Sequence, residues 1–335
     1  MTGISKFTNT GIFSTFNLLW DISHDPQYGT LLGFTETEIR RHFSSHLANA
    51  AQQLGMTVDD LMDQLRLNYD GYCFDEKNST HVFSNWSILN FFNSPRREFK
   101  NYWWMSAGQP AVLMKYLKRN AVTGIEKYDA LIPVAKTKLE SAQTYAEMDF
   151  DILLFHLGYL TIKSIDSYDN LLFGYPNEEV RSSLAQLYAD AIFSRSLVDL
   201  PNPRPLLAEG QVSEFVSYLN SVFNLFDYVR YPVHDESSCR SHVQVLLVGA
   251  KILSSIEVRS AMGRSDLEIR IADKRWIFEF KYAAAEKDCD DKLKDAKSQI
   301  LEKRYGQGPD TSVRIRVAIV FNAVQRQFSH WEVVP

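Results

Sequence analysis

The stretch "GRSDLEIRIADKRWIFEFK", residues 263–281, has the pattern of a β-hairpin. Apolar side chains alternate with polar ones on both sides of Ala272-Asp273, as is typical of two strands with one buried face each. A short turn at Ala272-Asp273 would pair Leu267 with Phe278 and Ile269 with Trp276. The alternation therefore predicts a hairpin that buries all of its large apolar residues except Ile277 on one side.

The same pairing places Asp266 opposite Glu279 and puts both on the face that carries Lys281. Opposed residues in a sheet have Cβ atoms about 5 Å apart, so two carboxylates there repel each other unless a cation lies between them. Hard oxygen ligands suit Mg²⁺ or Mn²⁺. The pattern is equally compatible with a solvated polar face, and a one-residue slip in the turn would separate the two carboxylates.

The residues around the hairpin predict the order α-β-β-β-α-β. We expect a buried helix at 237–253, a strand at 255–261, the hairpin, a helix at 286–306 stopped by Gly306, and a strand at 313–322. A helix between strands 275–281 and 313–321 implies a right-handed crossover and a parallel strand pair. The C-terminal part is therefore expected to be an α/β domain.

The preceding chain has mainly helical patterns. Leu61, Leu65 and Tyr69 recur at helical spacing, and Asp70-Gly71 ends that helix. Residues from about 110 to 225 are expected to be mostly helical, with a break at the Pro-rich stretch "LPNPRPLL", residues 200–207.

Composition describes an ordinary folded protein of 335 residues, with 45% hydrophobic residues and a formal net charge of −5. Such a charge gives no global attraction to nucleic acid or to an anionic membrane, so contacts of that kind must be local. Cys73, Cys239 and Cys289 lie far apart, which favours a reducing cytoplasm over a disulfide or zinc framework. No segment approaches the ~20 apolar residues of a membrane span, and no membrane partner is expected.

The hairpin and its flanking elements resemble the PD-(D/E)xK nuclease superfamily. More narrowly, the whole chain resembles bacterial proteins that combine an AAA-ATPase-like region with such a nuclease domain, through blocks that include "TGISKF", "YDGYCF", "FSNWSILNFF" and "YPNEEVR". The resemblance implies a partial ATPase-like region at 1–110, a helical connector at 111–225 and a restriction-endonuclease-like domain at 226–335.

The resemblance also implies a site for Mg²⁺- or Mn²⁺-dependent hydrolysis of phosphodiester bonds in DNA. Asp266, Glu279 and the backbone carbonyl of Phe280 match the metal ligands, and Lys281 matches the catalytic lysine. Further candidates are Glu236, Gln299 and Tyr305, which match an additional acid and two residues that some subfamilies place beside the site. Each has a plainer alternative: a charge favoured at a helix start, a surface residue and a packing aromatic, respectively.

One feature departs from the resemblance, because the phosphate-binding pattern G-x-x-x-x-G-K-[ST] occurs nowhere in the chain. We therefore expect no complete ATP site and no ATP hydrolysis by this polypeptide, which is expected to begin inside the ATPase-like domain. Two alternatives to a nuclease stay open: a catalytically idle binding or regulatory module with the same fold, and a fragment of a longer ATPase-nuclease. The sequence does not specify the oligomeric state.

Overall fold

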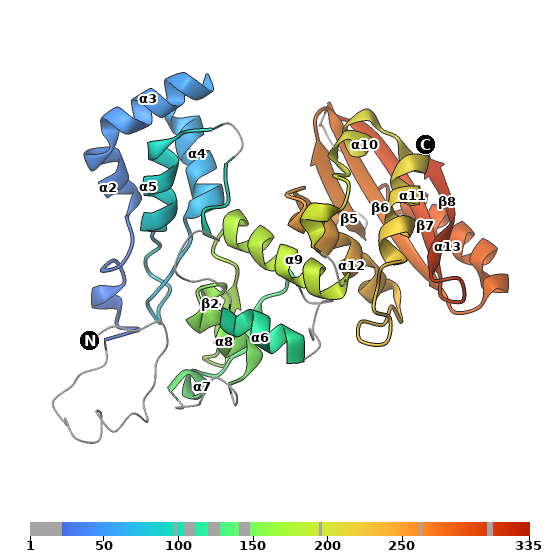
Figure 1. The fold of residues 1–335 in the computed structure, drawn as a ribbon, viewed down its shortest axis with the longest axis horizontal. Coiled ribbons are helices and arrows are strands. Elements are labelled where there is room, and N and C mark those ends of the chain that lie inside the picture. Colours follow the sequence, from blue (N-terminus) through green and yellow to red (C-terminus); the bar gives the residue numbers. More distant parts are fainter. Residues whose placement is uncertain are drawn as a thin grey trace. The chain divides into compact units, whose positions relative to one another are not determined.

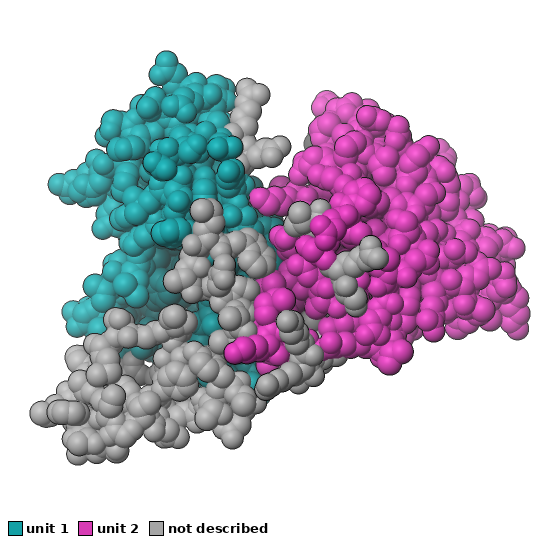
Figure 2. All heavy atoms as spheres, in the orientation of Figure 1, with its two compact units in different colours: residues 1–113, 129–183 teal, residues 114–128, 184–335 magenta. Residues whose placement is uncertain are grey.

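The computed structural model describes residues 22–96, 99–103, 111–119, 128–140, 148–193, 196–260, 263–306 and 311–335. The block "TGISKF" lies outside these residues. The chain forms two compact units: unit 1 contains residues 1–113 and 129–183, and unit 2 contains residues 114–128 and 184–335 (Figure 2). These units describe packing, and the division at residues 110 and 225 stays a prediction. In the part of the chain that is described, no helix is both long and apolar enough to cross a membrane.

The first part of unit 1 is helical. Its elements are η1 (Pro26–Tyr28), α2 (Glu36–His42), α3 (Ser44–Leu54), α4 (Val58–Tyr69) and α5 (Asn85–Asn93). Helix α4 confirms the predicted helix: Thr57 and Asp60 form a capping box at its start, and Leu61, Leu65 and Tyr69 are fully buried. Gly71 follows with a φ of +91°, the left-handed conformation that only glycine adopts without strain.

A three-stranded antiparallel sheet lies in the region that was expected to be mostly helical. It contains β1 (Ile132–Val134), β2 (Thr161–Ile165) and β3 (Leu171–Gly174) in the order β1-β3-β2. The region is mostly helical, as expected, but this small sheet was not predicted, because short apolar runs such as these do not distinguish strand from helix by periodicity. The helices of this region are α6 (Ala111–Arg119), α7 (Lys136–Glu140), α8 (Phe150–His156) and α9 (Glu178–Ile192).

Unit 2 is built on a five-stranded mixed sheet (Figure 1). In spatial order its strands are β4 (Ser254–Ser260), β5 (Gly263–Ile271), β6 (Lys274–Ala283), β7 (Val313–Asn322) and β8 (Gln327–Val334). Strands β6 and β7 are parallel, as predicted, and the other neighbours are antiparallel. Strand β8 was not predicted, because it carries only two buried residues, Phe328 and Val334.

Helices cover both faces of this sheet. They are α10 (Arg204–Glu209), α11 (Val212–Phe223), α12 (Glu236–Gly249) and α13 (Cys289–Glu302), with short 3₁₀ turns η4 (Leu197–Asp199) and η5 (Glu286–Asp288). On one face Phe215 of α11 contacts the rings of Trp276 and Phe278. On the other, Ile300 of α13 packs with Ile277 in a buried cluster. Helix α13 therefore covers the polar face of the hairpin. This excludes the alternative interpretation of that face as a simple solvated surface.

The hairpin has the predicted register. Leu267 pairs with Phe278 and Ile269 with Trp276, and Ile271 pairs with Lys274 across the two-residue turn. Ala272 in this turn has a φ of +51°, a left-handed conformation that is strained for a residue with a Cβ atom.

We expect Ala272→Gly to raise the free energy of unfolding by about 0.5–1 kcal/mol, because relief of left-handed strain exceeds the added entropy of the unfolded chain. Urea denaturation followed by circular dichroism measures this change. As a control, Ala296→Gly in the middle of α13 should lower the same free energy by about 1 kcal/mol. A loss of stability in Ala272→Gly similar to that of the control would contradict the strained turn.

Candidate active site

The site lies where strands β5 and β6 part. Their pairing ends at Leu267 and Phe278, whereas β6 continues beside β7 as far as Ala283. At the point of separation, Oδ2 of Asp266 accepts a hydrogen bond from the backbone N–H of Phe280 at 2.8 Å. The Asp266 carboxylate thus takes the place of a strand partner, and this bond fixes it beside the end of the ladder.

Glu279 is the most enclosed acid of the site. Its side chain is 1% exposed, and Oε1 accepts a hydrogen bond from Nζ of Lys281 at 2.8 Å. Its Oε2 is buried and has no hydrogen-bond partner among the residues that the structure describes. Burial, with the negative charge of Asp266, raises the pKa of Glu279 to about 7.

Asp266 and Lys281 respond to the same surroundings. Burial raises the pKa of Asp266, while the Phe280 N–H and the charges of Lys281 and Arg240 oppose that rise. Burial works against the charge of Lys281, but its hydrogen bond with Glu279 and the neighbouring carboxylates outweigh it, so its pKa is raised. Lys281 is therefore a charged ammonium held among acids in a poorly solvated place.

Helix α12 contributes two more charged groups. Glu236, its first residue, has Oε2 3.4 Å from Nζ of Lys281, so the structure brings this predicted residue to the site. Arg240, one turn further on, lies with Nη1 3.8 Å from Oδ1 of Asp266, and its side chain is only 10% exposed. The sequence interpretation missed Arg240. A cation four residues after Glu236 on a buried helix was the signal that could have found it.

Comparison with known proteins agrees with this arrangement, since residues 240–331 match the PD-(D/E)XK nuclease superfamily. Unit 2 carries a PD-(D/E)XK nuclease superfamily domain. The chain is also 28% identical, over 304 residues, to an uncharacterized protein in the vnfD 5′ region of Azotobacter chroococcum mcd 1. That alignment covers 84% of this chain and 53% of the relative, so the chain spans about half the length of the relative. The ATPase-like assignment of residues 1–110 rests on the sequence blocks alone.

Two predicted residues of the nuclease superfamily domain pair with each other. Nε2 of Gln299 donates to the hydroxyl of Tyr305 at 3.1 Å, and the Tyr305 ring is fully buried with Ile277 and Ile300. Burial raises the pKa of Tyr305; the hydrogen bond from Gln299 opposes the rise, and the charges of Glu279 and Asp266 add to it. The ring of Tyr305 packs in the buried cluster that contains Ile277, and a role of its hydroxyl in the site stays a prediction.

The side chain of Phe280 packs in the core, and its backbone belongs to the site. Its ring is fully buried and stacks on Phe278, on the face opposite Glu279 and Lys281. Its N–H holds Asp266. The proposed use of its carbonyl as a metal ligand stays a prediction.

The donors of this site fit a hard divalent cation. Mg²⁺ is commonly held by one or two carboxylates and completes its shell with water and substrate phosphate. Asp266 and Glu279 supply two carboxylates, and the unpartnered Oε2 of Glu279 offers a buried oxygen. No group of three or more His, Cys, Asp and Glu residues suited to a metal occurs in the described ranges. Two carboxylates, one of them with an unpartnered buried oxygen, are a donor set that suits Mg²⁺ or Mn²⁺.

Proposed function

We propose that this protein is a cytoplasmic nuclease that uses Mg²⁺ or Mn²⁺ to hydrolyse phosphodiester bonds in DNA. The observation that carries the proposal is the buried Glu279 carboxylate, with one unpartnered oxygen, beside Asp266 in a PD-(D/E)XK nuclease superfamily domain. Asp266 and Glu279 would hold the ion, and a bound ion would supply Lewis-acid activation of the phosphodiester and of water. The three buried, unpaired cysteine thiols are compatible with the cytoplasm.

Lys281 is placed to stabilise the negative charge that develops on the attacking water or on the phosphate oxygens during hydrolysis. An ammonium has three N–H donors, and Glu279 and Glu236 accept two of them at 2.8 and 3.4 Å. We assign the third to the attacking water or to a phosphate oxygen in the transition state. Because both carboxylates and the sheet hold Lys281 before substrate arrives, little reorganisation is needed during the reaction.

The residues around the metal ligands have supporting roles in this proposal. Arg240 orients Asp266 by its charge, and Glu236 fixes the position of Lys281. Gln299 and Tyr305 hold the end of α13 against the polar face of β6. Glu279 has to be ionised to bind a cation, so cation binding competes with its proton.

One observation favours the alternative of an idle binding module. Lys281 and Arg240 lie beside the two carboxylates and neutralise them without any ion. In an idle module these pairs would be the final state of the site, whereas in a nuclease Asp266 and Glu279 would hold a divalent ion as well as these two side chains.

A nuclease assay on the purified full chain separates the two functions. We expect cleavage of plasmid or single-stranded DNA with Mg²⁺ or Mn²⁺, none with EDTA, and a loss of at least about 100-fold in Lys281→Met. The matched control Lys274→Met, at the first residue of β6 next to the turn, should keep wild-type activity, because the Lys274 ammonium pairs only with the exposed Asp273 among the described ion pairs. Equal inactivity of wild type and Lys281→Met on DNA and RNA would favour the idle module.

A further inference from the structure

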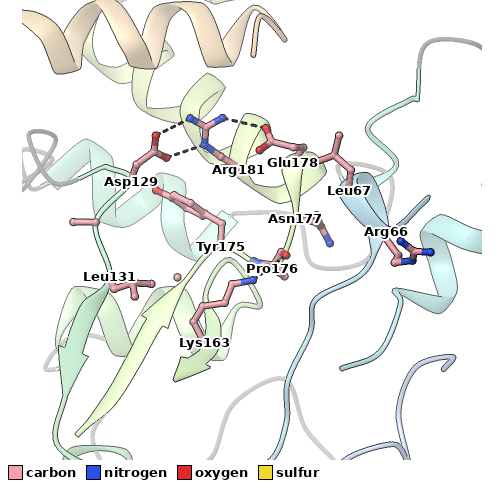
Figure 3. A pocket seen from close by; sticks show the side chains of 12 residues that line it. Arg66, Leu67, Asp129, Leu131, Lys163, Tyr175, Pro176, Asn177, Glu178 and Arg181 are labelled. Carbon is pink, nitrogen blue, oxygen red and sulfur yellow. Dashed lines mark hydrogen bonds and ion pairs between the residues drawn. The ribbon is translucent and has the colours of Figure 1, made fainter. Parts of the chain in front are cut away.

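Unit 1 contains a pocket that the proposed nuclease function does not use. It has a volume of about 370 Å³, within the range of small-molecule sites. Its lining comes from the end of α4, the residues just before β1, the middle of β2, the end of β3 with the loop that follows, and the start of α9, all within unit 1 (Figure 3). The pocket is therefore formed by a single compact unit.

Lys163 is placed in this pocket by an irregularity of the sheet. The pairing of β2 with β3 shifts between Ile162 and Ser164, so Lys163 is the extra residue of a β-bulge. Bulges re-aim side chains and are common at functional sites. Gly174 on β3 leaves room for it, because a Cβ atom there would lie 3.0 Å from Cγ of Lys163.

The ammonium of Lys163 retains donors that a ligand can use. Among the described residues it donates one hydrogen bond, to the carbonyl oxygen of Pro176 at 3.1 Å, and has no ion pair within 4.0 Å. An ammonium has three donors, so two remain for a ligand. Burial lowers the pKa of Lys163, and the nearby Asp70 opposes this and favours the charged form.

The other charged side chains of the lining already form ion pairs. Arg181 pairs with Asp129 at 2.7 Å and with Glu178 at 3.1 Å, as the dashed lines in Figure 3 mark. Arg66 pairs with Glu36 at 3.0 Å and also with Asp63. Arg181 thus takes both anions of the lining and Arg66 pairs with two carboxylates outside it, so among the described residues Lys163 is the lining cation that has no ion pair within 4.0 Å.

The rest of the wall is partly apolar. Leu67 and Leu131 are 45% and 50% exposed, which is high for large apolar side chains, and Tyr175 and Pro176 complete this part of the lining. We propose that the pocket binds a small organic carboxylate, whose carboxyl group pairs with Lys163 and whose apolar body lies against Leu131 and Tyr175. A monoanion suits this pocket better than a dianion, because Lys163 is one cation and the carboxylates paired with Arg66 and Arg181 would repel a second negative charge.

Fluorine NMR of 4-fluorophenylacetate titrated with the full chain tests this site. We expect a Kd on the order of 1 mM, as is usual for a ligand of about ten heavy atoms. The neutral 4-fluorophenylacetamide should bind at least tenfold more weakly. Lys163→Met should weaken binding of the carboxylate at least tenfold, whereas Lys77→Met, which removes an exposed lysine outside the lining, should not.

A second variant keeps the test decisive if Lys163→Met does not fold. Leu131→Trp changes a half-exposed side chain, which the fold tolerates, and fills the pocket, so it should also abolish binding. Equal binding of acid and amide, undiminished binding by a folded Lys163→Met or by Leu131→Trp, or tighter binding of the dianion 4-fluorophenylphosphonate would overturn the proposal. Absence of any binding at 10 mM probe, about ten times the expected Kd, would do the same.

Discussion

Asp266→Asn is expected to lower Mg²⁺-dependent DNA cleavage by about 1,000-fold while the protein stays folded. The amide oxygen of asparagine can still accept the hydrogen bond from the Phe280 N–H, so the strand ends keep their geometry. What is lost is the negative charge that a divalent ion needs. Activity assays should therefore be paired with calorimetric titration of Mg²⁺, in which we expect the affinity to fall together with the activity.

Asp273→Asn is the matched control for this substitution. Asp273 lies in the exposed turn of the same hairpin and pairs with Lys274, far along the strands from Asp266. The control should cleave DNA like wild type. If Asp266→Asn retained activity within about threefold of wild type, the assignment of Asp266 as a metal ligand would have to be abandoned.

Glu279→Gln is expected to abolish cleavage and yet stabilise the metal-free protein at pH 8. The folded state raises the pKa of Glu279 from 4.5 to about 7, so it binds the proton more tightly than the unfolded chain does. Protonation of Glu279 therefore contributes to the free energy of unfolding. This contribution is complete below pH 4.5 and is lost as the pH rises to about 7. Above that range, burial of the charged carboxylate costs up to about 3 kcal/mol, which a neutral glutamine avoids.

Urea denaturation in EDTA at pH 5 and pH 8 measures this effect. Wild type should lose more free energy of unfolding between the two pH values than Glu279→Gln does, and Mg²⁺ should restore wild type at pH 8 but not the variant. Glu332→Gln, which changes a half-exposed acid paired with Lys297, should retain the wild-type pH dependence. If Glu279→Gln lost as much free energy of unfolding between pH 5 and pH 8 as wild type does, Glu279 would not be the group responsible for this pH dependence.

The hairpin could be predicted from sequence because the residues that determine it are close together in the chain. Strict alternation and a two-residue turn at Ala272-Asp273 allow one register that buries all the large apolar residues but Ile277, and the structure has that register. The parallel pairing of β6 with β7 follows from the helix between them. These features depend on residues close in the chain or on a general rule of chain connection.

Other features could not be predicted because they depend on distant contacts. Ile277 was the one large apolar residue predicted on the polar face, and the packing of α13 against it explains why it is buried. The spacing from Glu236 could have marked Arg240 as a candidate, but its approach to Asp266 depends on how α12 packs against the sheet. The bulge at Lys163 likewise arises from the pairing of two short strands that periodicity did not identify.

The hydrogen bond between Asp266 and the Phe280 N–H has a consequence for how this domain can change during evolution. A relative that no longer needed a cation could lose the charge at position 266 without harm, but an alanine there would leave a buried N–H without a partner, at about 1–3 kcal/mol. Asparagine avoids that penalty. Homologues that have lost nuclease activity should therefore be enriched in asparagine, rather than alanine, at this position. The need for a hydrogen-bond acceptor for the Phe280 N–H remains after the need for a metal ligand is gone.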